Sequence, residues 1–158
     1  MNRLATIRAA IAACLAAVPD IGHVHPWERY IREEAKFRDL YLYTPQGGQP
    51  QLRGWWLRRT QTEERSINIA RSIAIETWTV RGYMALNDSE ASELVFDDLV
   101  EAFRDAVRAD PSFGGVCLPG PLTDDGQDGV QVSDVGPVNF CGVLCHSAVL
   151  QLRTWSYL

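Results

Sequence analysis

The chain has 158 residues, of which 46% are hydrophobic and 22% charged. This is enough for one domain with a core of its own, and it argues against a disordered chain. The formal net charge of −5 disfavours a module that grips nucleic acid, because such modules need a basic surface. Lys36 is the only lysine among 15 basic residues. Arginine suits pairing across interfaces, although a GC-rich genome would produce the same bias.

The first twenty residues predict an amphipathic helix. Asn2 can cap its start, and Pro19-Asp20 ends it. Arg8 interrupts the alanine-rich run, so we expect a folded helix and not a targeting segment. The apolar residues recur every three or four positions, which is the helical period: Leu4, Ile7, Ile11, Leu15 and Val18.

Short elements are expected next. Residues 21–27 form a strand candidate that Pro26 would end or confine to a sheet edge. Residues 28–39 suggest a short, weakly amphipathic helix or an irregular insertion. A loop rich in turn residues at 44–50 separates two further strand candidates: 40–43 and 52–61.

The second of these strands begins a long hairpin. Gly54 within it predicts a bulge. Residues 63–68 are polar enough to form the hairpin tip, and 69–83 form a long returning strand. Both faces of the returning strand carry apolar residues, so we expect it to be central in its sheet.

Residues 78–110 combine a strand end, a turn and one long amphipathic helix. Asn87 can cap the helix, with Glu90 in the capping-box position, and Asp110-Pro111 stops it. Leu94, Leu99 and Phe103 are expected to hold the helix to the sheet. They belong to an apolar stripe with helical spacing: Ala91, Leu94, Val95, Leu99, Ala102, Phe103, Ala106 and Val107.

The rest of the chain predicts a meander of strands. Short strands at 116–118 and 130–135 flank an acidic loop, and 138–155 suggests one unbroken strand. Helices do not alternate regularly with strands, so we predict an α+β fold and not an α/β fold. In this single domain, residues 1–158, a mostly antiparallel sheet carries two main helices on one face and a long β-hairpin arm.

No catalytic, metal or cofactor site is expected, and the chain is not expected to be an enzyme. Cys145 and His146 would point to opposite faces of a strand, a poor geometry for zinc. The glycines fit no phosphate-binding motif, and residues 123–129 lack the terminal glutamate of an EF-hand. None of the cysteines has an activating neighbour, and we expect them to be reduced and buried: Cys14, Cys117, Cys141 and Cys145.

Aromatic and arginine residues remain, and both suit protein–protein interfaces. Trp55 and Trp56 adjoin and must face opposite ways in a strand, so core filling does not easily place both. The hairpin is locally basic in an acidic protein, so we expect it to be a contact arm that meets an acidic surface, such as the helix face or the loop between the last strands. The alternative is a solvated edge. The candidate contact residues are Arg53, Arg58, Arg59, Arg65, Trp55, Glu93, Asp97, Glu101, Asp124 and Asp125.

Several stretches resemble the tail terminator (tail completion) proteins of long-tailed bacteriophages and prophages. They are AVPDIGHVH at 17–25, WTVRGYMALNDSEAS at 78–92, DPSFGG at 110–115 and VNFCGVLCHSAVLQL at 138–152. Together they cover most of the chain, and residues 28–66 match least well. The family offers no catalytic residues to carry over.

The resemblance implies a small α+β protein that assembles into a homohexameric ring. The ring would cap the finished tail tube, stop its polymerisation and offer the surface for head–tail joining. Its partners would be the tail tube protein and a head-completion or connector protein, with DNA passing through the lumen without specific binding. The protein would be assembled in the host cytoplasm and would lie at the head-proximal end of the tail in the virion, away from any membrane.

Two alternatives stay open at this point. The chain could be a small cytoplasmic enzyme or ligand-binding α+β domain with a strand-lined pocket. It could also be another ring-forming phage component, such as a tube or head-completion protein. Solution mass separates the first alternative from the ring, and self-assembly into long tubes would indicate the second.

Overall fold

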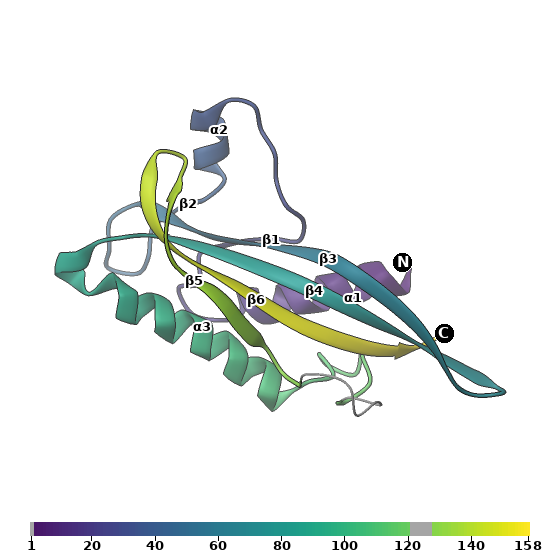
Figure 1. The fold of residues 1–158 in the computed structure, drawn as a ribbon. Coiled ribbons are helices and arrows are strands. Elements are labelled where there is room, and N and C mark those ends of the chain that lie inside the picture. Colours follow the sequence, from purple (N-terminus) through teal and green to yellow (C-terminus); the bar gives the residue numbers. More distant parts are fainter. Residues whose placement is uncertain (1, 121–127) are drawn as a thin grey trace.

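One six-stranded sheet organises the computed structural model, which describes residues 2–120 and 128–158 (Figure 1). Its strand order is β1-β3-β4-β6-β5, and β2 pairs with β3 beside β1. Only the β1–β3 pairing is parallel, so the predicted α+β fold with a mostly antiparallel sheet is confirmed. The elements are α1 (Arg3–Ala16), β1 (His23–His25), α2 (Glu34–Asp39), β2 (Leu42–Tyr43), β3 (Gln51–Asn68), β4 (Arg71–Ala85), the 3₁₀ turn η1 (Asp88–Glu90), α3 (Ser92–Ala109), β5 (Gln131–Phe140) and β6 (Val143–Tyr157).

Helices α1 and α3 pack on the same face of the sheet, and the main core lies between them and the strands. Asn2 caps α1 as predicted, since its Oδ1 accepts a hydrogen bond from the Ala5 amide at 2.8 Å. The rings of Trp55 and Phe96 stack with centroids 5.7 Å apart and join β3 to α3. The other large side chains of this core are Ile7, Ile11, Leu15, Leu57, Trp78, Val80, Leu99, Phe103, Leu150 and Leu152.

A smaller aromatic cluster covers the other face of the sheet beneath α2. Trp56 belongs to it with 9% of its surface exposed, whereas Trp55 is 1% exposed in the main core. Both tryptophans therefore fill core positions, on opposite faces, and the expectation that core filling does not easily place both is wrong. The two faces each have a core because α2 and the residues after it bring Phe37 and Tyr41 over the sheet.

Strands β3 and β4 form the predicted long hairpin, which projects beyond the helices (Figure 1). Its irregularities lie between Arg59 and Gln61 and near the tip, and pairing at Gly54 is regular, so the predicted bulge there is wrong. Gly54 is needed for space instead, because a Cβ atom would lie 2.5 Å from the Tyr41 ring. Strand β4 is central, as predicted, between β3 and β6.

Helix α3 begins later and faces the sheet differently from the prediction. Asn87 makes no side-chain cap, and the residue before the helix is Ala91 in the left-handed conformation, at φ 51°. Leu94 is 66% exposed, while Phe96, absent from the predicted stripe, is buried. The prediction that Leu94 holds the helix to the sheet is therefore wrong, because the buried stripe follows Phe96, Leu99, Val100, Phe103 and Val107.

The predicted strand at 138–155 is two strands. Cys141 and Gly142 both have positive φ, at 52° and 75°, and form a tight turn between Phe140 and Val143, the backbone of a two-residue hairpin. Residues 116–118 form no strand, although the Leu118 amide donates to Trp155 O at 2.8 Å. Within residues 2–120 and 128–158, no helix has the length and apolar character needed to cross a membrane.

Candidate interaction surfaces

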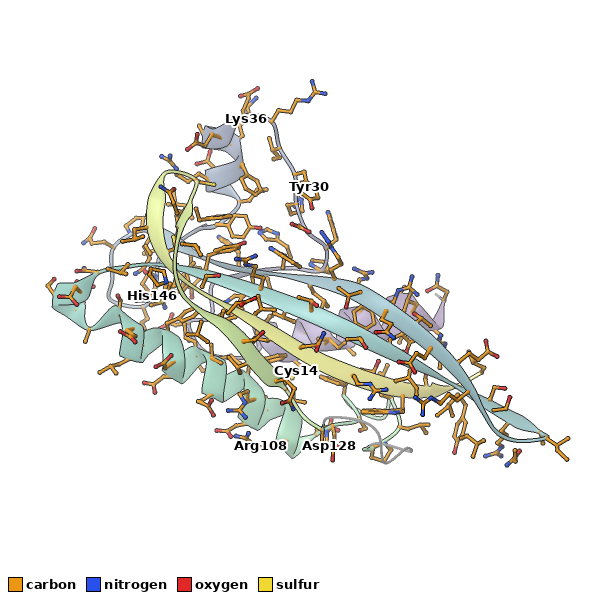
Figure 2. All side chains as sticks on the ribbon, viewed as in Figure 1. Cys14, Tyr30, Lys36, Arg108, Asp128 and His146 are labelled. Atoms are coloured by element: carbon orange, nitrogen blue, oxygen red, sulfur yellow. The ribbon has the colours of Figure 1, made fainter. Side chains whose placement is uncertain are left out.

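The first candidate surface is the arm, defined here as residues 58–77 of the β3–β4 hairpin. Arg58 is held within the chain by three contacts: an ion pair with Glu28, a hydrogen bond of 3.1 Å to the Tyr30 hydroxyl, and a cation–π contact 5.4 Å from the Trp56 ring. These contacts fasten the loop before α2 to β3. Figure 2 shows Tyr30 on that loop, beside β3.

Two other predicted arginines lie further out on the arm. Arg59 is exposed and donates to Thr62 Oγ1 at 3.0 Å. The pKa of Arg8 on α1 is lowered, mainly by burial and to a smaller extent by the nearby positive charge of Arg59. Arg65 forms an ion pair with Glu63 at 3.1 Å. Arg59 is therefore the predicted arginine best placed to reach a neighbouring molecule.

Arg53 and Trp55 do not belong to an exposed surface, which corrects their prediction as contact residues. Arg53 donates to Asp20 O at 2.9 Å, and Trp55 Nε1 donates to Ile21 O at 2.8 Å. Both side chains are buried. They fasten the segment after α1 onto β3, because each donates a hydrogen bond to a backbone carbonyl of that segment.

The acidic candidates on α3 face away from the core. Glu93 and Asp97 are exposed, and within the described ranges no ion pair joins either to a basic side chain. Glu101 differs, since it pairs with Arg104 at 2.6 Å. The free acids therefore gather toward the N-terminal end of the helix. Asp124 and Asp125 lie outside the residues that the structure describes.

The arm and the acidic helix flank opposite edges of the sheet. Helix α3 lies beside β5, where Arg104 Nε donates to Val130 O at 3.3 Å and a hollow opens between Asp97 and Pro137. Strand β3 lies on the other side of β4 and carries Arg59 (Figure 1). Arg59 therefore lies near one edge of the sheet, and the α3 acids Glu93 and Asp97 lie near the other.

Both of these edges leave backbone groups open. Beyond Trp56, the part of β3 that the structure describes pairs with β4 alone, and β5 pairs with β6 alone. Open strand edges can take up a strand from another chain. On β5, Pro137 and the register shift between Ser133 and Gly136 limit such addition.

A serine–histidine pair that the sequence did not predict lies at the start of α3. His146 Nε2 is 2.7 Å from Ser92 Oγ, which also accepts the Asn87 amide at 2.8 Å. The His146 ring stacks on Phe96 with centroids 5.8 Å apart. Figure 2 shows His146 near the N-terminal end of α3, with Arg108 near the other end. The pair fixes the helix start, and its partners are 54 residues apart, so no local pattern identifies it.

The remaining histidines and the cysteines make structural contacts. His23 and His25 donate from Nε2 to the carbonyls of Leu42 and Leu40, at 2.7 and 2.9 Å. All four cysteines are free thiols, with Cys117 and Cys145 buried. No group of three potential ligands for a metal ion occurs within residues 2–120 and 128–158.

Comparison with known proteins assigns the chain to no family. No protein-family model matches the chain, and a search of curated proteins found no significant match.

Proposed function

We propose that the chain is a structural subunit of a bacteriophage tail, the tail terminator, which assembles as a ring on the completed tail tube. The observation that carries the proposal is that the hairpin arm, which carries Arg59 and Arg71, and the acids of α3 lie on opposite sides of the molecule. A surface that complements the opposite side of its own molecule makes head-to-tail contacts. Such contacts close into a ring when the rotation between copies is right.

The resemblance of residues 17–25, 78–92, 110–115 and 138–152 to tail terminators supports the same proposal. In this reading six copies form the ring. One ring face stops the polymerisation of tail tube protein, and the other joins a head-completion or connector protein in the virion.

The overall charge fits a ring through which DNA passes. The chain has a net charge of −5, and the exposed face of α3 carries Glu93, Asp97 and Asp98 without ion-pair partners in the described parts of the chain. A strongly basic lumen would bind and retain a passing polyanion. The proposal therefore assigns DNA no specific binding site.

A tube-capping assay tests this function. Tail tube protein is polymerised with and without the chain, and tube lengths and ends are measured by electron microscopy. The proposal predicts shorter tubes with a ring at one end. Arg59→Glu should reduce capping, while Arg32→Glu, an exposed charge reversal in the loop before α2, should not. Tubes that grow to the same length with and without the chain would refute the proposal.

A second candidate function has one observation in its favour, the Ser92–His146 pair. A serine within hydrogen-bond reach of a histidine is the core of many hydrolase sites, and a hollow of about 230 Å³ adjoins it. No carboxylate hydrogen-bonds to His146 in the part of the chain that the structure describes. A fluorophosphonate probe, which reacts with active-site serines, tests whether Ser92 is a nucleophile. If the probe labels the wild-type chain but not Ser92→Ala, an enzyme is favoured.

A further inference from the structure

The tip of the arm carries two exposed isoleucines, Ile67 and Ile69, which are here called the knob. Ile69 is fully exposed, at 109% of its reference surface, and Ile67 is 49% exposed. Local hydrogen bonding closes the turn between them, because Asn68 Oδ1 accepts the Ala70 amide at 2.9 Å and the Asn68 backbone pairs with Arg71. The charged residues nearest to these isoleucines in sequence, Arg65 and Arg71, are both basic.

The opposite end of the molecule carries an acid-rimmed hollow, here called the end hollow. It consists of two adjoining hollows of about 230 and 330 Å³ that share Leu86, Glu93 and His146. Leu94 lines the first hollow and Val135 the second, and both are largely exposed. The acids at its rim, Asp88, Glu93 and Asp97, form no ion pairs within residues 2–120 and 128–158.

The knob cannot fill the end hollow of its own chain. The 15 residues of β4 run from Arg71 beside the tip to Ala85, which adjoins Leu86 of the hollow. At about 3.3 Å per residue this strand separates the two sites by about 50 Å. Any contact between them therefore joins two molecules.

We propose that the arm tip of one copy docks into the end hollow of the next copy, with Ile67 and Ile69 against Leu86, Leu94 and Val135. This contact rests on the ring proposed above and names its subunit interface. It covers side chains that otherwise leave apolar surface in water, at a favourable free energy. It also brings Arg71 toward unpaired acids, and complementary charges select the partner and its orientation. The occupant is a second copy, because the two surfaces match in both apolar character and charge.

Site-directed cross-linking tests the contact. In a Cys14→Ser, Cys141→Ser background, which removes the partly exposed thiols, Ile69→Cys and Leu94→Cys are made in separate chains. The chains are mixed under assembling conditions and oxidised mildly. The proposal predicts a disulfide dimer that needs both variants, and a ladder of larger species when one chain carries both cysteines. The matched control is Asp105→Cys, an exposed position toward the other end of α3, which should not cross-link to Ile69→Cys.

A second measurement separates this contact from the ring itself. Ile69→Asp should raise the concentration needed for half-assembly by about tenfold or more, as expected for an anchor side chain in an interface. Two results together would overturn the contact: normal ring formation by Ile69→Asp, and no disulfide between Ile69→Cys and Leu94→Cys. The proposed function would then still stand. A wild-type chain that forms no ring, alone or with tail tube protein, would overturn both.

Discussion

At the scale of single residues, the main polar feature of the core is a buried carboxylate. Glu76, on the central strand, is 0% exposed, and its Oε1 lies 2.7 Å from Nη1 of Arg3 at the start of α1. Arg3 also donates to Ser156 Oγ, and Thr154 Oγ1 donates to Glu76 Oε2 at 3.5 Å. A charge removed from water in this way depends on its partner.

Removing the arginine should therefore destabilise the fold. Breaking a buried ion pair costs about 3–5 kcal/mol because one charge is left uncompensated. We expect the low end, about 3 kcal/mol, for Arg3→Met, since 35% of the Arg3 side chain reaches water. The free energy of unfolding in urea measures this. Adding Glu76→Gln to Arg3→Met should recover part of the loss, and equal stability of the single and double variants would contradict the account.

The buried thiols give a prediction for alkaline pH. Burial, aided for Cys117 by the nearby Glu76 charge, raises the pKa of Cys117 and of Cys145 from 9.0 to about 11. Between pH 9 and pH 11 the unfolded chain loses these protons first, so the folded chain binds more protons and stability falls as pH rises. Chemical denaturation at several pH values should show this decline, and Cys117→Ser should flatten it. A stability that stays constant through this window would contradict the assignment.

At the scale of elements, α3 offers a matched pair of substitutions on one helix. Phe103 is fully buried in the main core, and Leu94 is 66% exposed. Phe103→Ala should cost about 3–5 kcal/mol, because it removes buried contacts and leaves a cavity. Leu94→Ala should change the stability by less than about 0.5 kcal/mol, as exposed substitutions do. Urea titrations of both variants check the orientation of the helix, and equal losses would contradict it.

The elements that the sequence predicted well are those set by local patterns. The cap and apolar stripe of α1 and the central position of β4 follow from residues a few positions apart. The start of α3 was mispredicted because it depends on a left-handed Ala91 and on His146, which is distant in sequence. The turn between β5 and β6 was missed because Cys141 adopts a positive φ, for which glycine, asparagine and aspartate are the usual signals.

Some of the candidate contact residues that the sequence suggested are exposed, and others are buried. Charge along the sequence indicated Arg59, Glu93 and Asp97, which are exposed. The charge pattern alone could not show that Arg53 differs from these residues. Arg53 is buried and donates a hydrogen bond to Asp20 O. The end hollow was not predicted at all, because η1, α3, β5 and β6 bring its residues together only in the folded chain.

At the scale of the whole molecule, the chain is long in one direction and carries unlike surfaces at its two ends. The arm tip presents Ile69, and the end hollow presents Leu94 beside Glu93 and Asp97. If the two proposed surfaces bind each other, the copies form either an open filament or a closed ring, depending on the rotation between them. The proposed tail terminator function predicts closure at six copies.

The mass of the assembly in solution distinguishes a closed ring of copies from a single chain. Native mass spectrometry across a range of concentrations, with and without tail tube protein, distinguishes one copy from a closed ring. One copy weighs 17.7 kDa, so six copies weigh about 106 kDa. A closed six-copy ring gives a discrete species of that mass, at high concentration or on tube ends, and no larger series. A chain that stays at 17.7 kDa under all of these conditions would contradict the proposed ring.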